Sequence, residues 1–237
     1  MKLFFLVFIS FFVLGAFCVF FDQAILTRKG TIYRVKTKNK KVVLTFDDGP
    51  SPVWTTKILD ELKKAGIKAT FFVIGHHVKK YPEIARRIVK EGHEIGNHGY
   101  AHSVMFYYKP AEIEEEIQYT EQVIHEITGV RTKYFRPPKA WLRKSIKDKI
   151  KSMGYEIILW SLNSKDWVCF NHKDIVKYIS KSVRNGDILL FHDSGNVFSI
   201  EGGIRTQTVK TITLLVKTLE DRGFKFVTIE ELLNETK

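Results

Sequence analysis

The feature that most constrains the fold of this chain is an alternation of short apolar runs with longer segments of helical spacing. Seven runs are apolar or β-branched, and the six segments between them repeat their apolar residues with the period of an amphipathic helix. Such alternation is typical of a parallel sheet covered by helices, most simply a closed or nearly closed α/β barrel, with a doubly wound open sheet as the alternative. The predicted strands are 42–46, 70–74, 93–97, 132–135, 156–160, 187–191 and 225–228, and the predicted helices are 54–65, 82–90, 110–127, 142–153, 173–183 and 206–222.

Polar residues directly follow five of the predicted strands. In α/β barrels the residues that carry the chemistry lie on the loops after the strands, at one rim of the barrel. We therefore expect these side chains to converge on one site. They are Asp47 and Asp48, His98 and His102, Arg136, Asp166, and His192 and Asp193.

Two adjacent aspartates, Asp47 and Asp48, follow the first predicted strand in the motif "TFDDGP". A single aspartate would be explained by turn chemistry or by a cap on the next helix. Two adjacent carboxylates repel each other unless a cation or an arginine lies between them or one of them holds a proton. Those arrangements belong to metal and acid-base sites, so the pair predicts a functional site at the end of this strand.

The motif "NHGYAH" places His98 and His102 one helical turn apart, close enough to bind one ion from one side. Alone this signal is weak, because histidine pairs are more often surface or core residues. With one aspartate the pair forms the two-histidine, one-aspartate set of a catalytic zinc or similar divalent metal, with a fourth position for water. The second aspartate is then free to take a proton from that water.

Arg136 in "FRPP" and the pair of His192 in "LLFHD" with Asp166 in "SKDW" complete the expected site. Arg136 is the natural partner for the free carboxylate and would hold it ionised. Asp166 would keep His192 protonated, so that the imidazole can give a proton to a leaving group. A base, an acid and a metal between them predict hydrolysis of an amide or an ester.

These motifs, in this order and spacing, resemble the signature motifs of the polysaccharide deacetylases, known as carbohydrate esterase family 4 or the NodB homology domain. The resemblance rests on "TFDDGP", "GHEIGNHGYAH", "FRPP", "SKDW" and "LLFHD", and it covers about residues 41–233. It implies a distorted (β/α)7 barrel. It also implies metal-dependent removal of acetyl groups, usually from N-acetylglucosamine in peptidoglycan, chitin or related polymers.

The resemblance also implies a role for each matching residue. Asp47 would be the general base, oriented by Arg136, and His192 would be the general acid, tuned by Asp166. The implied metal ligands are Asp48, His98 and His102. The implied substrate-binding residues are Trp167 and Leu190, around the acetyl methyl group, and Pro138 and Lys139, in the groove loop. The backbone N–H of Lys139 would stabilise an oxyanion. Zinc is the expected metal, although such ligands also take cobalt, nickel or manganese.

Two departures from the family pattern concern the metal loop and the groove loop. Gly99 stands where the family usually has serine or threonine, so a hydroxyl that supports the ligands is missing. Lys139 and Ala140 stand where the family usually has an aromatic residue and glycine, which bears on substrate preference. Every proton-transfer and metal position keeps a suitable residue.

The first residues of the chain predict export. Residues 3–21 carry no charge and are about long enough to cross a bilayer, and no clean small-x-small cleavage site follows them. We expect residues 1–26 to be an uncleaved signal anchor, 27–40 a basic linker and 41–237 the catalytic domain. The domain would be extracellular at the cell membrane, or secreted if the segment is cleaved. Arg28 and Lys29 argue against the simplest positive-inside orientation.

The formal net charge of +12 suits an anionic polymer or membrane surface. No nucleic-acid-binding motif accompanies it, so we expect no nucleic acid as partner. Only two cysteines are present, and Cys18 lies in the apolar segment, so no disulfide within the domain is expected. We expect a monomer that acts on an N-acetylated glycan. An esterase for O-acetyl groups and a non-catalytic wall-binding protein are the alternatives.

Overall fold

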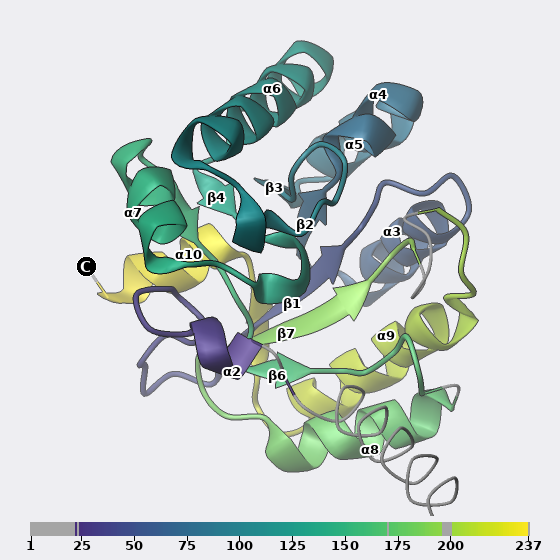
Figure 1. The fold of residues 1–237 in the computed structure, drawn as a ribbon. Helices are drawn as coiled ribbons and strands as arrows, with labels where there is room; N and C mark the ends of the chain where they lie inside the picture. Colours follow the sequence, from purple (N-terminus) through teal and green to yellow (C-terminus); the bar gives the residue numbers. More distant parts are fainter. Residues whose placement is uncertain (1–21, 23, 170, 196–200, 237) are drawn as a thin grey trace, which may run out of the picture.

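Eight short strands form one parallel sheet in the computed structural model of the protein (Figure 1). The structure describes residues 22, 24–169, 171–195 and 201–236. The strand order is β5-β4-β3-β2-β1-β7-β6, and β8 pairs with the first half of β1. The strands are β1 (Lys41–Asp47), β2 (Thr70–Val73), β3 (Glu94–Asn97), β4 (Tyr134–Phe135), β5 (Glu156–Ile157), β6 (Leu162–Asn163), β7 (Asp187–His192) and β8 (Lys225–Val227).

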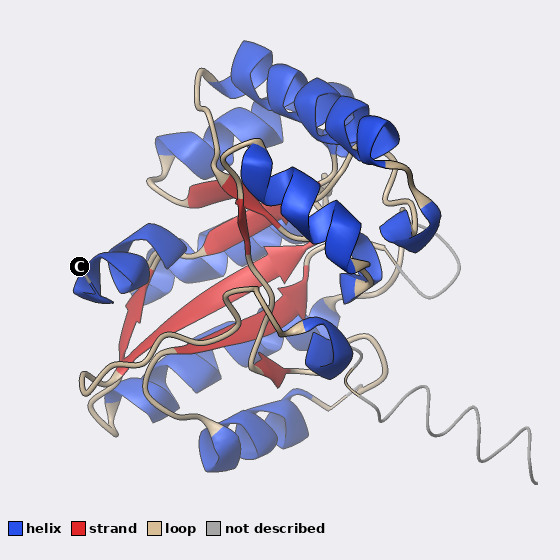
Figure 2. Cartoon of the chain, turned by 60° about the vertical axis from the view of Figure 1, so that its left-hand side comes forward, coloured by secondary structure: helices blue, strands red, loops and turns tan. Residues whose placement is uncertain are grey.

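Most helices cover the outer face of this curled sheet, whereas the two short helices that carry Ala24 and Ile229 pack against its inner face (Figures 1 and 2). Val42, Leu44 and Phe46 of β1 belong to the large apolar core beneath the helices, whereas Val43 belongs to a second core on the inner face. The helices are α2 (Ala24–Thr27), α3 (Trp54–Ala65), α4 (Gly75–Lys80), α5 (Pro82–Lys90), α6 (Pro110–Thr128), α7 (Lys144–Ser152), α8 (His172–Ser182), α9 (Thr206–Glu220) and α10 (Ile229–Leu233).

Local sequence explains where individual helices begin and end. In α3 the residues Ile58, Leu59 and Leu62 recur on one side and are buried. The helix ends at Gly66, which adopts the left-handed conformation that glycine accepts without strain. The observed bounds of α3 and α5 equal those predicted from the sequence, while α4 and α10, which are only one or two turns long, were not predicted.

The predicted strand 156–160 is wrong in its second half. β5 ends at Ile157, and a separate strand, β6, begins at Leu162 on the opposite edge of the sheet. Residues 158–161 cross between the two edges. The carbonyl groups of Ile158 and Leu159 accept from a buried arginine described below, and those of Trp160 and Ser161 accept from Arg28. No described strand pair joins β5 to β6, so the sheet curls as a half-barrel and does not close by a hydrogen-bonded ladder.

The segment before β1 packs against this gap in the sheet. Ile32 exchanges backbone hydrogen bonds with Ile157 and Leu159, and the N–H of Val35 donates to the carbonyl of Gly186. Ala24 is fully buried. Residues 24–35, part of which was expected to be a linker, thus contribute to the inner core. Of the expected anchor, residues 1–26, positions 1–21 and 23 lie outside the described residues, whereas 24–26 belong to the docked helix α2. Within the described part no helix has the length and apolar character to span a membrane.

Candidate active site

The two aspartates lie at the end of β1, in the middle of the sheet. β1 pairs with β7 over its length, and this register places Asp47 opposite His192. Asp47 is the last residue of the strand and is buried. Asp48 follows with a positive φ of 79°, which turns its side chain away from the strand direction. The strand end therefore separates two adjacent carboxylates into different surroundings.

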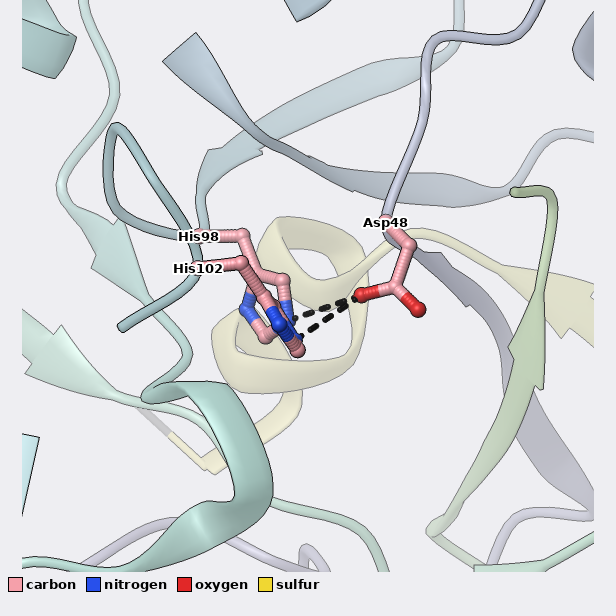
Figure 3. Close-up of side chains that lie close together, drawn as sticks. All are labelled: Asp48, His98 and His102. Carbon is pink, nitrogen blue, oxygen red and sulfur yellow. Dashed lines mark ion pairs between the residues drawn. The ribbon is translucent and has the colours of Figure 1, made fainter. Parts of the chain in front are cut away.

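Asp48 lies beside both histidines of the "NHGYAH" motif (Figure 3). Its Oδ1 atom is 3.1 Å from Nε2 of His102 and 3.4 Å from Nε2 of His98. These three residues form the one group of potential ligands close enough to share a metal ion in the part of the chain that the structure describes. Burial acts to raise the pKa of Asp48, but His102 and His98 outweigh it and hold the pKa well below its usual value. Asp48 is therefore an ionised ligand candidate.

The hydrogen bond on the other side of His98 supports a cation at this place. Nδ1 of His98 lies 2.7 Å from the carbonyl oxygen of Arg136. Because a carbonyl only accepts, Nδ1 carries a proton, and in the tautomer with that single proton Nε2 presents a lone pair toward the carboxylate of Asp48. Two acceptors 3.4 Å apart repel each other unless a cation or an extra proton lies between them. The two imidazoles and the carboxylate thus fit a divalent metal, and nothing in the geometry selects which one.

The loop that carries the two histidines is held by residues that the motif analysis did not select. The side-chain oxygen of Asn97 accepts from the N–H of Gly99, and Oε1 of Glu116 on α6 accepts from the N–H groups of Tyr100 and Ala101 at 2.8 and 3.2 Å. Asn97 is the residue directly before His98 and was available as a signal. Glu116 lies on a separate helix, and no local pattern connects it to the loop.

Arg136 is fully buried on the inner face of the sheet and binds the other aspartate. Its NH1 group donates to Oδ1 of Asp47 and to Oγ1 of Thr45, both at 2.7 Å. The remaining N–H groups donate to the carbonyls of Ile158 and Leu159. Burial lowers the pKa of the guanidinium, and the charge of Asp47 opposes that shift. A buried charge pair with its hydrogen bonds satisfied fixes the position of Asp47.

Asp166 and His192 form a second pair next to β1. Nδ1 of His192 donates to Oδ1 of Asp166 at 2.8 Å, and Thr208 on α9 donates to the other carboxylate oxygen. Burial acts to lower the pKa of His192, but the charge and hydrogen bond of Asp166 raise it above its usual value. Burial acts to raise the pKa of Asp166, and His192 outweighs it, so that the pKa is lowered. The imidazolium is therefore stabilised inside the protein.

The four residues expected to bind substrate differ in exposure. Trp167 is half-buried directly after Asp166, and Leu190 is buried in the inner core. Pro138 is buried, whereas Lys139 is exposed and has a positive φ of 55°. The structure thus brings the predicted acid-base and metal-site residues together at one rim. Leu190 packs within the core, as its apolar side chain alone would also predict.

Two more buried polar residues next to the aspartates were not assigned roles from the sequence. Nδ1 of His77 donates to the backbone carbonyl of Asp48 at 2.7 Å. Asp193 is fully buried, accepts a hydrogen bond from Thr55 and contacts Gly49 so closely that a Cβ there would collide with its carboxyl group. Burial raises the pKa of Asp193 to about 7. Both residues support the turn that presents Asp48.

Comparison with known proteins decides the family. The model of the family described as polysaccharide deacetylase matches residues 34–158. The chain belongs to the polysaccharide deacetylase family. A peptidoglycan-N-acetylglucosamine deacetylase of Bacillus cereus is 34% identical to it, and the alignment covers 85% of this chain and 92% of the relative. The peptidoglycan-N-acetylmuramic acid deacetylase PdaC of Bacillus subtilis is also 34% identical, and that alignment covers 84% of this chain and 40% of the relative.

Solved structures of polysaccharide deacetylases have the same fold. The structure of the Bc1960 peptidoglycan N-acetylglucosamine deacetylase superposes with a TM-score of 0.81 and 30% identity, covering 86% of this chain and 92% of that one. BA3943 of Bacillus anthracis, named a pseudoenzyme of carbohydrate esterase family 4, superposes with a TM-score of 0.78 and 28% identity, covering 86% and 68%. The prediction of an enzyme of the polysaccharide deacetylase family is confirmed. The predicted distorted (β/α)7 barrel is confirmed as an α/β fold with a parallel sheet, which curls into a half-barrel.

Proposed function

We propose that this protein removes acetyl groups from N-acetylglucosamine residues of a cell-wall polysaccharide, by metal-dependent hydrolysis of the amide. One arrangement carries the proposal: the buried Asp47–Arg136 pair, and the pair of buried Asp166 with partly exposed His192, both lie close to the cluster of Asp48, His98 and His102. A base and an acid on opposite sides of an electrophilic centre are what amide hydrolysis requires.

In this proposal Asp48, His98 and His102 hold a divalent cation. When bound, the cation polarises the acetyl carbonyl and makes a water molecule more acidic. Zinc is the metal we expect, with cobalt, nickel and manganese as alternatives that the same ligand types accept. The carboxylate of Asp48 is ionised before a cation binds, because its pKa lies well below its usual value.

The proton transfers are assigned to the two paired residues. Asp47, oriented by its hydrogen bond from Arg136, accepts a proton from the water whose oxygen attacks the acetyl carbon. His192, charged through its bond to Asp166, donates a proton to the sugar nitrogen as the carbon–nitrogen bond breaks. The products are acetate and a glycan with a free amine. The backbone N–H of Lys139 would stabilise the oxyanion, and Trp167 and Leu190 would contact the acetyl methyl group.

The place of action we propose is the outside of the cell membrane, on peptidoglycan or a chitin-like oligomer. The uncharged residues 3–21 would anchor the chain, and the net charge of +12 suits an anionic wall. The relatives named above support peptidoglycan and differ in the sugar, which is N-acetylglucosamine in one and N-acetylmuramic acid in the other. The exposed Lys139 and the buried Ala140 in the groove loop are where sugar preference would differ.

Two alternative functions use the same surface. An O-acetyl esterase would need the same residues, because both reactions add water to an acetyl carbonyl. A non-catalytic wall-binding protein is disfavoured by the two satisfied charge pairs, since binding needs neither a base nor an acid. The solved pseudoenzyme in this family makes direct measurement of turnover necessary.

The test is release of acetate by the full-length protein from an N-acetylglucosamine oligomer, from peptidoglycan and from an O-acetylated xylan. Each reaction is run with added zinc and with chelator, and with the variants Asp47→Asn and Asp60→Asn, the second an exposed matched control on α3. We expect release from the N-acetylated substrates that chelator abolishes and Asp47→Asn lowers about 10²- to 10⁴-fold. Release from xylan alone would identify the esterase. Absence of release by folded, metal-loaded protein would leave the binding function.

A further inference from the structure

The short helix α2 exposes apolar side chains although it is firmly attached to the fold. Ile25 is 50% exposed and Leu26 is 75% exposed, whereas Ala24 and Thr27 of the same turn are buried. Ala24 packs in the inner core beside Trp160. The helix therefore uses its small residues to dock and directs its two large aliphatic residues outward, the reverse of the usual preference of a water-facing helix.

Several polar contacts prevent α2 from swinging away from the domain. Nε1 of Trp160 donates to Oδ1 of Asp22 at 2.9 Å, and the guanidinium of Arg28 donates to the backbone carbonyls of Trp160 and Ser161 at 3.2 and 3.4 Å. Directly afterward, Ile32 pairs with the backbone of the β5 edge. α2 is thus held at both of its ends.

The sequence leaves no spare length between this fixed point and the apolar segment. The uncharged run ends at Phe21, and Asp22 already contacts the domain. One residue spans at most about 3.6 Å of extended chain, so the surface around α2 must lie within a few ångströms of the point where the chain leaves a bilayer. A catalytic domain joined by a flexible linker would not have this constraint.

Cationic and aromatic side chains lie next to the residues that flank the two exposed aliphatic residues in sequence. Nζ of Lys147 on α7 donates to the backbone carbonyls of Thr27 and Lys29, and the ammonium group of Lys151 lies beside Gly30. Lys29 and Lys151 are exposed. Tyr178 of α8 is 44% exposed and lies near Asp22. Partial burial of the phenol, and secondly the charge of Asp22, raise the pKa of Tyr178. In the view of Figure 1, α2 lies between α7 and α8.

We propose that this α2 face, formed by Ile25, Leu26, Lys29, Lys151 and Tyr178, rests on the surface of an anionic lipid bilayer. Aliphatic residues would enter the headgroup boundary, tyrosine suits the interface, and each lysine would gain from nearby lipid phosphates. The inference rests on the membrane anchor proposed above and deepens it, because it fixes the orientation of the domain. α2 also lies against the groove loop at Pro138–Ala140, so this orientation would keep the substrate groove near the membrane.

The experiment measures lipid contact at single positions of the full-length chain in vesicles. Both native cysteines, Cys18 and Cys169, are first replaced by serine. An environment-sensitive fluorophore is then attached at one of three positions: Leu26→Cys in the α2 face, Gln118→Cys on the solvent side of the remote helix α6, or Phe12→Cys in the apolar segment. Quenching by spin-labelled lipids is compared in vesicles of phosphatidylcholine alone and of phosphatidylcholine with phosphatidylglycerol.

We expect loss of fluorescence at positions 26 and 12 and none at position 118, with a larger loss at position 26 when phosphatidylglycerol is present. Lys29→Glu combined with Lys151→Glu should remove that dependence on lipid charge, whereas Lys63→Glu with Lys217→Glu, at exposed positions on α3 and α9, should not. Quenching at 12 without quenching at 26 would overturn the proposed face and leave the anchor intact. Absence of quenching at both positions would overturn the anchor as well. Emission at position 26 that reports an apolar environment, without quenching by the spin-labelled lipids, would overturn the lipid contact and assign the face to another partner.

Discussion

Asp47 and Asp48 are neighbours in the chain but lie in different electrostatic surroundings. Asp47 continues the strand and meets the guanidinium of Arg136, while Asp48 turns through a positive φ and meets two imidazoles. Each carboxylate has its own positive or metal-binding partner, so the repulsion expected of adjacent charges is offset twice. This division of surroundings matches the two separate roles proposed above, a base for Asp47 and a metal ligand for Asp48.

At the same scale, Asp166 should control the pH dependence of the reaction through His192. The general acid must be protonated, so activity falls as the pH rises through the pKa of His192. Asp166 raises that pKa, and Asp166→Asn should therefore move the alkaline limb of the pH–kcat profile to lower pH, in addition to lowering kcat. Thr208→Val, which removes only a hydrogen bond to Asp166, is the matched control and should give a smaller change. An alkaline limb that does not move in Asp166→Asn would remove His192 from the role of acid.

Gly99 is required by its backbone conformation, although the family usually has a hydroxyl residue there. Its φ is +77°, and a Cβ would lie 2.8 Å from Cε of Met105. Gly99→Ala should therefore destabilise the protein by more than the roughly 1–2 kcal/mol of left-handed strain alone. Gly66→Ala separates the two causes, because Gly66 has a φ of +70° and open space around its Cβ position. Equal losses in denaturant unfolding would show that the contact with Met105 adds nothing.

At the scale of elements, a carboxylate on α6 substitutes for the missing hydroxyl in holding the metal loop. Glu116 accepts two backbone N–H groups between His98 and His102, so Glu116→Ala would leave both donors without this partner. We expect metal affinity to fall about 10- to 100-fold, measured by competition with a chromophoric chelator. Glu116→Gln keeps the accepting oxygen and should lose less, and Glu115→Ala, at the exposed neighbouring position, should change nothing. Unchanged affinity in Glu116→Ala would contradict the positioning role.

At the scale of the whole molecule, the segment before β1 fills the gap between the two edges of the sheet. Ala24 and Val35 are buried there. Arg28 and Ile32 form hydrogen bonds with the backbone of residues 157–160, to which Arg136 also donates. A chain that begins at Asp22 should therefore have nearly the same free energy of unfolding as the full-length protein. A chain that begins at Lys36 should lose about 2 kcal/mol or more, from the apolar burial of Val35 and its neighbours. Equal midpoints in urea would show that residues 22–35 are dispensable.

Periodicity and turn residues in the sequence are local signals, and they were sufficient for the elements that depend on local chemistry. The apolar spacing of residues 54–65 predicted α3 with its bounds, and the alternation of segments predicted the parallel sheet. The strand after α7 was predicted as one piece because Ile158, Leu159 and Trp160 are apolar. In the structure their carbonyl groups bind arginines from other segments: those of Ile158 and Leu159 accept from Arg136, and that of Trp160 accepts from Arg28.

The sequence by itself determined which residue types stand at the ends of the strands, and therefore that carboxylates, imidazoles and a guanidinium would meet at one rim. Parallel strands bring these positions together whatever the details of packing. Only the tertiary structure decided which partner each group has: Glu116 from α6 for the metal loop, Thr208 from α9 for Asp166, and residues 24–35 for the open edge of the sheet. Such contacts join residues far apart in the chain, and their geometry is fixed by the packing of whole elements, which no local pattern encodes.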